Sequence, residues 1–401
     1  MLQDKIFKLK GKVQHYAWGG TTFIPQWLGI DNPENKPFAE YWMGAHPSAS
    51  STINMDNEEK NLYELIKNDP GLFIGSATDK MFGGLPYLFK ILDVKDMLSI
   101  QVHPSKAAAA KGFDEEEANN ILITASNRNY KDKNHKPEVL IALSEVWLLH
   151  GFLTKDKLLK VLQTIPTFNS FEKIFLDKGY EGLYEHIMLM PQKQSDEILS
   201  ALIDKEITRK KNDQLTKADA GWWVSKLYEK EKPASGFDCG IFSIYLFNIV
   251  KVEPGEAVFQ GAGVPHAYLE GQNVELMANS DNVLRGGLTP KHIDVPELLK
   301  HITFEGIEPG VMKGSQLTGG ERNYPCPVED FGISKIELSA GETYQSTTNS
   351  LEIIVVMEGE VQVEGINNLS VKKGEAFAVL PKETYSISTT VKAIAYKAFV
   401  P

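Results

Sequence analysis

Hydrophobic and polar positions follow two patterns along this chain. Up to about residue 149, short apolar runs stand between turns rich in Gly, Pro and Asn, which is typical of β-strands. The clearest predicted strands cover 85–92, 98–102 and 139–143. One helix is expected at 106–111, where four alanines follow one another and Gly112 supplies a stop signal.

The spacing of apolar positions changes to the helical period in the next stretch. Apolar residues three and four positions apart follow Thr154 and Ser195, so each of these two residues is expected to cap a helix. Asp219 is expected to begin a third helix, rich in Trp222, Trp223 and Leu227. Residues 233–236, Pro-Ala-Ser-Gly, then mark a boundary, and strands are expected to return from Phe237 onward.

A weak internal repeat links two β-rich parts of the chain. Residues 252–257 (VEPGEA) resemble 371–376 (VKKGEA), and each string leads from one β-rich run into another through a Gly turn. Repeated all-β units of this kind suggest two related jelly-roll barrels. The same offset places His266 opposite Tyr385, so only the first copy has a metal-capable side chain there and is the candidate active domain.

These patterns predict a mainly β fold with an α-helical insertion. Residues 1–150 and 236–310 are expected to form a discontinuous catalytic jelly roll, and 151–235 the inserted helical domain. Residues 311–401 are expected to form a second, metal-free jelly roll.

Composition narrows the class of protein. The chain has 401 residues, 42% of them hydrophobic, which is ample for a large core in two or three domains. The net charge of −11 repels polyphosphate backbones, so no nucleic-acid partner is expected. We also expect no membrane segment, no export signal and, with two cysteines, no disulfide framework. The prediction is a cytoplasmic protein, monomeric or weakly homo-oligomeric.

Three short strings carry residues that suit metal chemistry. Gln101 and His103 lie two positions apart, so on a strand both face the same side. Glu138 opens an apolar strand, where a buried carboxylate must be paired, hydrogen-bonded or bound to metal. His266 lies in a segment whose backbone two glycines and a proline restrict. Taken singly, the first two strings also fit an edge strand and a surface turn.

Together these residues predict a metal centre. Two imidazoles, one carboxylate and the neutral amide oxygen of Gln101 suit zinc, with room for a water or substrate oxygen. One carboxylate against a divalent ion leaves a net charge of +1, so the centre keeps Lewis acidity toward a hydroxyl or carbonyl oxygen.

A fourth string, 279–291, contains Arg285 followed by paired glycines, which suits a loop that approaches a ligand closely. The alternative for Arg285 is a surface salt bridge with Asp281. With Lys106, Lys136 and Lys291, Arg285 is expected to form a local cationic cluster for a small phosphorylated or carboxylated substrate.

Between residue 16 and about residue 300 the sequence resembles the type I mannose-6-phosphate isomerase family. The strings that carry the resemblance are YAWG at 16–19, AEYWMGAHP at 39–47, QVHP at 101–104, NHKPE at 134–138, PHAYL at 265–269 and NSDNVLRGGLTPKH at 279–292. No departure occurs at the matched ligand and loop positions.

The resemblance implies a catalytic cupin domain with a helical insertion, plus a second, metal-free cupin domain. It implies one zinc ion per chain, held by Gln101, His103, Glu138 and His266. The implied reaction interconverts mannose 6-phosphate and fructose 6-phosphate by ring opening and proton transfer between C1 and C2 through a cis-enediol.

Roles for individual residues follow from that chemistry and the resemblance. Lys136, beside the metal and other cations, is the first candidate for the base at carbon, and Arg285 or zinc would stabilise the oxyanion. Ring opening is assigned to His135 with Asp281. The expected substrate-binding residues are Ser99, Lys106 and Lys291 at the phosphate, with Trp18 and Tyr268 as a wall against the sugar.

Two other functions stay open from the residues alone. His103, Glu138 and His266 would also satisfy an Fe(II) oxygenase of the cupin type, although Gln101 in a further position argues against it. A non-catalytic sugar-phosphate-binding protein is the remaining alternative, and it would give no solvent exchange at substrate C2.

Overall fold

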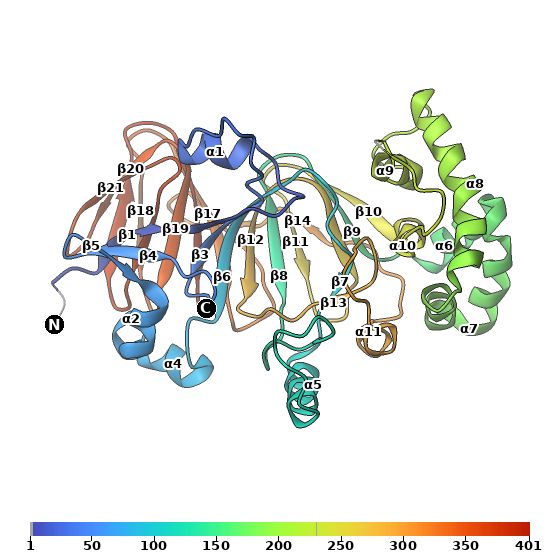
Figure 1. Cartoon of the computed structure of the whole chain (residues 1–401). Coiled ribbons are helices and arrows are strands. Elements are labelled where there is room, and N and C mark those ends of the chain that lie inside the picture. Colours follow the sequence, from blue (N-terminus) through green and yellow to red (C-terminus); the bar gives the residue numbers. More distant parts are fainter. Residues whose placement is uncertain (1–2, 230) are drawn as a thin grey trace.

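Strands from the two ends of the chain meet in one nine-stranded sheet (Figure 1). The computed structural model describes residues 3–229 and 231–401. In spatial order the strands of this sheet are β15 (Ser315–Gln316), β16 (Glu321–Tyr324), β17 (Gly332–Leu338), β24 (Ala393–Phe399), β19 (Glu352–Glu358), β22 (Ala376–Val379), β1 (Ile6–Lys10), β4 (Thr52–Met55) and β5 (Glu58–Asn61).

A four-stranded sheet completes the C-terminal β unit. Its strands, in spatial order, are β18 (Thr343–Thr347), β23 (Thr384–Ser388), β20 (Glu360–Glu364) and β21 (Leu369–Lys372). Buried side chains of both sheets form one apolar core, in which Ile354 and Phe377 of the larger sheet meet Val363 and Ile387 of the smaller one. This pairing of two sheets through an apolar core is the packing expected of a jelly roll.

An eleven-stranded sheet carries the predicted metal ligands. Its main path is β14 (Val311–Met312), β11 (Ala257–Gln260), β8 (Glu138–Ala142), β12 (His266–Ala278), β6 (Tyr87–Val94), β3 (Glu40–Gly44) and β2 (Lys12–Gln14). Four further strands branch from it: β7 (Gln101–Val102), β9 (Val146–Phe152), β10 (Phe247–Val252) and β13 (Leu284–Arg285).

The long strand β12 closes this sheet around an interior. Its first residues pair with β7 and β9, and its later residues pair with β8 and β6. The segments bearing His103, Glu138 and His266 are thereby brought to one place, although they lie far apart in the sequence.

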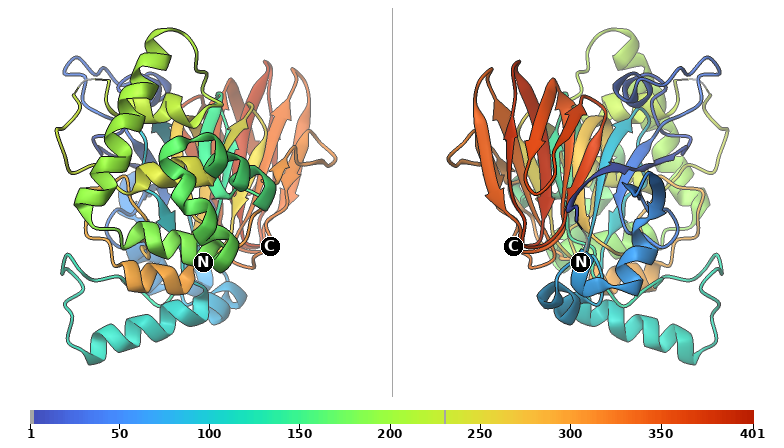
Figure 2. Two further views of the ribbon diagram at one scale, coloured as in Figure 1. Left: turned by 90° about the vertical axis from the view of Figure 1, so that its right-hand side faces the viewer. Right: turned by 90° about the vertical axis from the view of Figure 1, so that its left-hand side faces the viewer.

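Helices cover the end of this sheet that lies away from the C-terminal unit (Figure 2). The helices of that lobe are α6 (Lys155–Thr164), α7 (Asn169–Met188), α8 (Gln192–Lys211), α9 (Ala220–Leu227) and α10 (Gly240–Leu246), with a 3-10 turn at Pro166–Phe168. The other helices are α1 (Phe23–Leu28), α2 (Leu62–Asn68), α3 (Pro70–Phe73), α4 (Ser76–Phe82), α5 (Lys106–Ala118) and α11 (Val295–His301). No helix among the described residues is long and apolar enough to cross a membrane.

The mainly β fold with a helical insertion is confirmed. Predicted strands 85–92 and 139–143 form β6 and β8 with their ends shifted by one or two residues. The prediction of a strand over 98–102 is only partly right, because β7 contains just its last two residues.

Several helix predictions were wrong in detail. Helix α5 does not stop at Gly112 but runs on to Ala118. Gly112 serves packing instead, because a Cβ there would lie 2.3 Å from the ring of Tyr130. Ser195 is not a cap: it lies buried inside α8. Residues Gly240–Leu246, where strands were expected to return, form α10.

Thr154 and Asp219 do stand at the first position before α6 and α9. Neither side chain accepts a hydrogen bond from a described backbone N–H of its helix. Asp219 is used by the preceding turn, since its carboxylate accepts the Thr216 N–H at 2.8 Å. The sequence therefore located both helix starts without identifying what these side chains bind.

The internal repeat is confirmed in three dimensions. Gly255 and Gly374 occupy equivalent turns with φ of 85° and 86°. In each turn a glutamate that follows the glycine accepts the backbone N–H three residues earlier: Glu256 at 3.1 Å and Glu375 at 3.0 Å. Because φ is positive, glycine is the residue that fits both turns.

In the second copy of the repeat, Tyr385 stands at the position of His266, and its hydroxyl group is hydrogen-bonded. The Tyr385 hydroxyl donates to the Glu352 carboxylate at 2.6 Å, and Lys397 pairs with Glu321 at 2.9 Å. All these groups belong to the C-terminal unit. The division of the chain into three domains stays a prediction, and β1, β4 and β5, from the first 61 residues, contribute to the C-terminal sheet.

Candidate metal centre and active site

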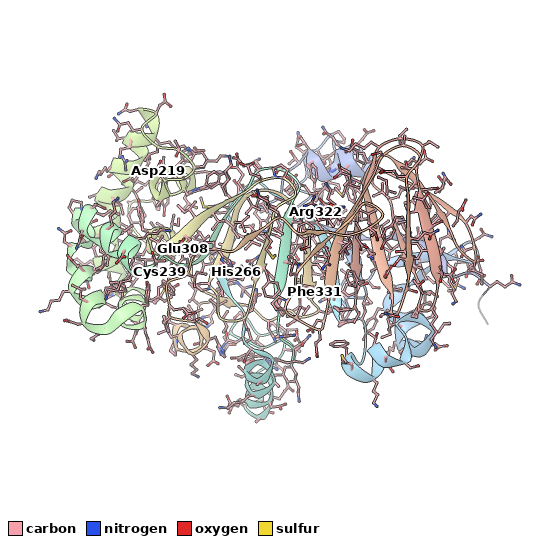
Figure 3. The ribbon with its side chains drawn as sticks, turned by 180° about the vertical axis from the view of Figure 1, so that it is seen from behind. Asp219, Cys239, His266, Glu308, Arg322 and Phe331 are labelled. Carbon is pink, nitrogen blue, oxygen red and sulfur yellow. The ribbon has the colours of Figure 1, made fainter. Side chains whose placement is uncertain are left out.

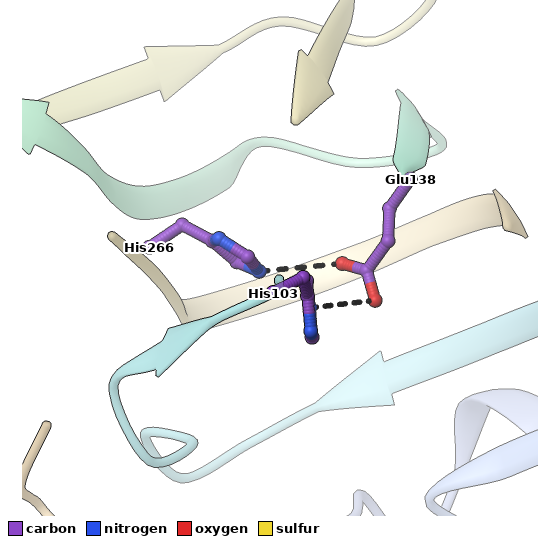
Figure 4. A group of neighbouring side chains, drawn as sticks. All are labelled: His103, Glu138 and His266. Atoms are coloured by element: carbon purple, nitrogen blue, oxygen red, sulfur yellow. Dashed lines mark ion pairs between the residues drawn. The ribbon is translucent and has the colours of Figure 1, made fainter. Parts of the chain in front are cut away.

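His103, Glu138 and His266 converge on one point (Figure 4). One ligand atom from each lies within 4.8 Å of the others. His103 Nε2 lies 3.3 Å from Glu138 Oε1, and His266 Nε2 lies 3.3 Å from Glu138 Oε2. Figure 3 places His266 between Cys239, on the helical side, and Phe331, on the C-terminal side. The predicted meeting of these three side chains is therefore observed.

Hydrogen bonds hold both imidazoles in the form that can bind a metal. His103 Nδ1 lies 2.8 Å from the Asn282 carbonyl oxygen, and His266 Nδ1 lies 2.9 Å from that of Val264. A carbonyl only accepts, so the proton belongs on Nδ1 and the lone pair on Nε2. Neither Nε2 atom has a hydrogen-bond partner among the described residues. Burial lowers the pKa of His103 to about 4, which keeps its ring neutral.

Glu138 supplies the negative charge of the group. It is the first residue of β8, with Gln260 of β11 on one side and Met277 of β12 on the other. Burial alone would raise the pKa of Glu138, but Lys136 and His103 outweigh it and hold that pKa well below its usual range. Two imidazole nitrogens and one carboxylate, all buried, fit a divalent ion such as zinc.

Gln101, the predicted fourth ligand, lies beside this group. In β7 it pairs with His266 on one side and with Arg285 of β13 on the other. Its side chain is half-buried. Its role as a ligand stays a prediction.

A buried polar network that the sequence analysis missed lies next to the three ligands. Lys90 pairs with Glu275 at 2.9 Å and with Glu40 at 3.5 Å. The Tyr268 hydroxyl donates to Glu275 and accepts from Gln260, both at 2.8 Å. Burial raises the pKa of Glu275. The sequence does contain a signal for this network, because a charged residue stands inside each of two long apolar strands. These residues are Lys90 in the 8-residue β6 and Glu275 in the 13-residue β12.

Tyr268 was expected to form a wall against the sugar. The structure places it inside the barrel, 4% exposed, as a member of this network. Trp18, the other expected wall residue, stacks on Tyr16 with ring centroids 5.9 Å apart. Burial and the nearby Glu40 raise the pKa of Tyr16, which places this second aromatic ring close to the network.

The structure does not bring together His135 and Asp281, the two residues to which ring opening is assigned. His135 Nε2 lies 2.9 Å from Asp330, whereas Asp281 Oδ2 lies 3.3 Å from His46 Nε2. Lys136 precedes Pro137 and so favours an extended backbone, in which neighbouring side chains point to opposite sides. Lys136 points at Glu138, with Nζ and Oε1 3.2 Å apart, and His135 therefore points elsewhere.

His46 holds Asp281 in a defined protonation state. The Ser48 backbone N–H donates to His46 Nδ1 at 3.3 Å, so the proton lies on Nε2, facing Asp281. This hydrogen bond holds the pKa of Asp281 below its usual range. His46 is 5% exposed and was not singled out from the sequence.

The predicted cluster of four cations is divided in the structure. Arg285 and Lys291 are close enough that Arg285, after burial, lowers the pKa of Lys291. The pKa of Lys131 is lowered by burial and by Arg128, with a smaller contribution from Arg285. Among the described residues Arg285 forms no ion pair, so the alternative salt bridge with Asp281 is absent. Ser99 precedes Ile100, which exchanges backbone hydrogen bonds with the glycines after Arg285.

Two of the four cations lie elsewhere. Lys136 pairs with Glu138, as described above. Lys106 lines a separate cavity of about 610 Å³ with Lys67 and Lys133, and its ammonium lies 5.7 Å from the centre of the Phe82 ring. Because Lys106 begins α5, its direction is set by that helix and not by the loop that carries Arg285.

Comparison with known proteins places this geometry in a family. A family profile described as phosphomannose isomerase type I, catalytic domain, matches residues 6–154. The mannose-6-phosphate isomerase of Escherichia coli (strain K12) is 38% identical, over 94% of this chain and 95% of that protein. The human mannose-6-phosphate isomerase is 32% identical, over 90% of this chain and 89% of that protein. The chain belongs to the type I phosphomannose isomerase family.

Solved structures of the family superpose on the whole chain. A mannose 6-phosphate isomerase crystallised with zinc matches with a TM-score of 0.86 and 34% identity, over 99% of this chain and 100% of that one. The Salmonella typhimurium mannose 6-phosphate isomerase, crystallised with fructose 6-phosphate and zinc, matches with the same values. The resemblance of the six sequence strings is confirmed, and so is the fold expected of this phosphomannose isomerase family.

Proposed function

We propose that this phosphomannose isomerase family member interconverts D-mannose 6-phosphate and D-fructose 6-phosphate and holds one zinc ion. The observation that carries the proposal is the buried meeting of His103, Glu138 and His266, with both Nε2 atoms turned toward one carboxylate. Family relatives crystallised with zinc and with fructose 6-phosphate support it.

The residues that would hold zinc are His103, Glu138 and His266, with Gln101 as the proposed fourth ligand. When bound, zinc supplies Lewis acidity toward a sugar hydroxyl or carbonyl oxygen.

Asp281 is the proposed group for ring opening. Its carboxylate takes the proton of the anomeric hydroxyl and returns it to the ring oxygen as the bond between C1 and that oxygen breaks, so protonation is unchanged overall. His46 keeps the carboxylate ionised and fixes its direction. His135 receives no step, because it lies against Asp330.

Lys136 remains the proposed base at carbon. In the direction from mannose it takes the proton from C2 as the C1–C2 double bond forms and the electron pair of the C1 carbonyl moves onto O1. A proton passes from the O2 hydroxyl to O1 through the cis-enediol, and Lys136 returns its proton to C1 as the C2 carbonyl forms. Arg285, which has no carboxylate partner among the described residues, would stabilise the developing oxyanion. Glu275 is a second candidate for this base, because it is a buried carboxylate beside Lys90 and Tyr268 and burial raises its pKa.

The phosphate is proposed to bind at the edge formed by Ser99, Lys131 and Lys291, around Arg285. Trp18 and Tyr16 form the proposed aromatic wall. Lys106 lines the separate cavity and is a proposed phosphate contact for a substrate that extends toward that cavity.

Proton exchange with solvent tests the reaction class. Mannose 6-phosphate incubated with zinc-loaded protein in deuterated water should yield fructose 6-phosphate and incorporate deuterium at the exchanging carbon. Binding without product or exchange would favour the sugar-phosphate-binding alternative, and oxygen consumption by ferrous protein would favour the oxygenase. Family membership favours the isomerase over both.

A further inference from the structure

Asn282 lies at the centre of the hydrogen bonds around the candidate metal centre. It is 0% exposed and stands between Asp281 and the strand that carries Arg285. Its backbone carbonyl accepts the Nδ1–H of His103 at 2.8 Å. This bond fixes which ring nitrogen of His103 carries the proton and which way Nε2 faces.

The Asn282 side chain grips a different segment, residues 131–134. Its Oδ1 accepts the backbone N–H of Lys131 at 2.7 Å and of Asp132 at 3.3 Å. Its Nδ2 donates to the carbonyls of Asp132 and Asn134, both at 2.8 Å. Because every partner is a fixed donor or a fixed acceptor, the amide has one orientation and its bonding capacity is filled.

The gripped segment leads directly into the candidate active site. Four residues after Asn134 comes Glu138, and between them lies Lys136, which faces Glu138 at 3.2 Å. The same segment is tied to Asp281, whose backbone N–H donates to Asp132 at 2.8 Å. One buried asparagine thus connects a histidine ligand, the approach to the carboxylate ligand and the loop of Asp281.

We propose that Asn282 is a positioning residue of the metal centre, which sets the Nε2 direction of His103 and the place of Glu138 relative to it. The proposal rests on the proposed zinc site. It goes beyond that site because Asn282 is not among the proposed zinc ligands or substrate-binding residues. Asn282 acts through its hydrogen bonds to His103 and to residues 131–134. Loss of the amide donors should therefore weaken metal binding even in protein that remains folded.

Any buried asparagine stabilises its loop, so a matched control is needed. Asn248 is 5% exposed, and its side-chain hydrogen bonds go to none of the three ligand side chains. Its Nδ2 donates to the carbonyls of Phe152 at 2.9 Å, Ile307 at 3.0 Å, His150 at 3.2 Å and Gly151 at 3.3 Å. Removing this amide perturbs a site of comparable burial between β10, the end of β9 and Ile307, away from the segment 131–134.

The experiment compares wild type, Asn282→Asp and Asn248→Ala. Asn282→Asp keeps the shape but turns two donors into acceptors that face carbonyl oxygens. Zinc affinity is measured by competition with a chromophoric chelator, alongside kcat and KM. Hydrogen exchange of the Lys131 and Asp132 backbone amides is measured in metal-free protein. We expect Asn282→Asp to weaken zinc binding on the order of 10- to 100-fold, to lower kcat more than it raises KM, and to speed exchange at both amides.

Asn248→Ala should leave zinc affinity within about twofold of wild type even if it lowers the melting temperature as much. Equal zinc affinities of Asn282→Asp and wild type would overturn the proposal, as would an equal loss in Asn248→Ala. If Asn282→Asp fails to fold, Ser280→Ala decides, because it removes the Ser280 hydroxyl bonds to Asp132 at 2.9 and 3.1 Å, to the Asn134 carbonyl at 3.3 Å and to the Asn282 N–H at 3.2 Å. Ser280→Ala should then weaken zinc binding severalfold, and unchanged affinity would overturn the proposal. A wild-type protein that binds no zinc contradicts the proposed function itself.

Discussion

Lys136 Nζ lies 3.2 Å from Glu138 Oε1, and that carboxylate also faces the two histidines of the candidate metal centre. Lys136, the base proposed to move the proton at carbon, therefore lies next to Glu138, a proposed metal ligand. A metal ion bound to Glu138 would weaken the Coulomb attraction between the Glu138 carboxylate and Lys136. Metal binding would therefore change the electrostatic environment of Lys136.

Removing the Lys136 amino group tests its role as base. Lys136→Met should keep zinc and lower kcat by about 10²- to 10⁴-fold, the range ascribed to a positioned general base. Steady-state assays with metal analysis check this. Lys133→Met is the matched control, since Lys133 pairs with Asp114 at 2.6 Å and its side chain is 56% exposed. Wild-type turnover in Lys136→Met would transfer the role to Glu275.

Removing one ligand should remove metal and activity together. His266→Ala deletes one of three converging ligand atoms, so its loss of zinc affinity should exceed the roughly 10- to 100-fold typical of residues behind a ligand. Elemental analysis after dialysis and the isomerase assay measure both losses. His292→Ala, an exposed histidine 26 positions later, should change neither. Activity without bound metal in His266→Ala would count against the centre.

The pair of His46 and Asp281 predicts a specific kinetic signature. His46→Leu loses the Nε2–H that holds Asp281, so ring opening should slow, by roughly 10²-fold for a misplacement of about 1 Å. A slow step before carbon–hydrogen cleavage hides the isotope effect of that cleavage. The deuterium isotope effect on kcat/KM with C2-deuterated mannose 6-phosphate should fall toward one in His46→Leu. An isotope effect that stays at or above the wild-type value would show that ring opening does not depend on His46.

Gly112 should be needed for packing. In Gly112→Ala the new Cβ would lie 2.3 Å from the Tyr130 ring, so overpacking should cost about 1–3 kcal/mol of unfolding free energy. Urea denaturation measures that cost. Gly84→Ala is the control, because no atom lies within 4 Å of its added Cβ. Equal midpoints for Gly112→Ala and wild type would mean that Tyr130 moves aside without cost.

Glu297 predicts a pH dependence of stability. Burial would raise its pKa, but hydrogen bonds from Lys300, Tyr130 and His301 lower it from 4.5 to about 2. Since the folded pKa is depressed, the carboxylate stabilises the fold above pH 4.5, and this stabilisation is lost as the pH falls toward 2. The difference in urea midpoint between wild type and Glu297→Gln should therefore shrink between pH 6 and pH 3. A difference that is constant over this range, measured against the exposed Glu64→Gln, would contradict the assignment.

The metal ligands could be predicted because their sequence strings restrict the backbone. Gly263, with φ of 80°, and Pro265 precede His266, and Glu138 opens an apolar strand. These signals depend only on neighbouring residues in the chain, so they can be read from the sequence. The repeat was visible for the same reason, since each copy needs a glycine in the same turn, at Gly255 and Gly374.

The partners of His135 and Asp281 could not be predicted, because they depend on distant segments. Asp330 lies 195 positions after His135, between β16 and β17 of the C-terminal unit. His46 reaches Asp281 across 235 positions, through the loops that follow β3 and β12. Lys90 and Glu275 were missed because their charges neutralise each other only when β6 and β12 pair. Neither strand alone shows that its charged residue has a partner.

Metal stoichiometry measured together with activity tests the central claim most directly. Purified protein should contain one zinc per chain, lose isomerisation of mannose 6-phosphate on exhaustive treatment with EDTA, and regain it in proportion to zinc added back, up to one equivalent. Full activity in protein shown by elemental analysis to be free of zinc and other divalent metals would contradict the account.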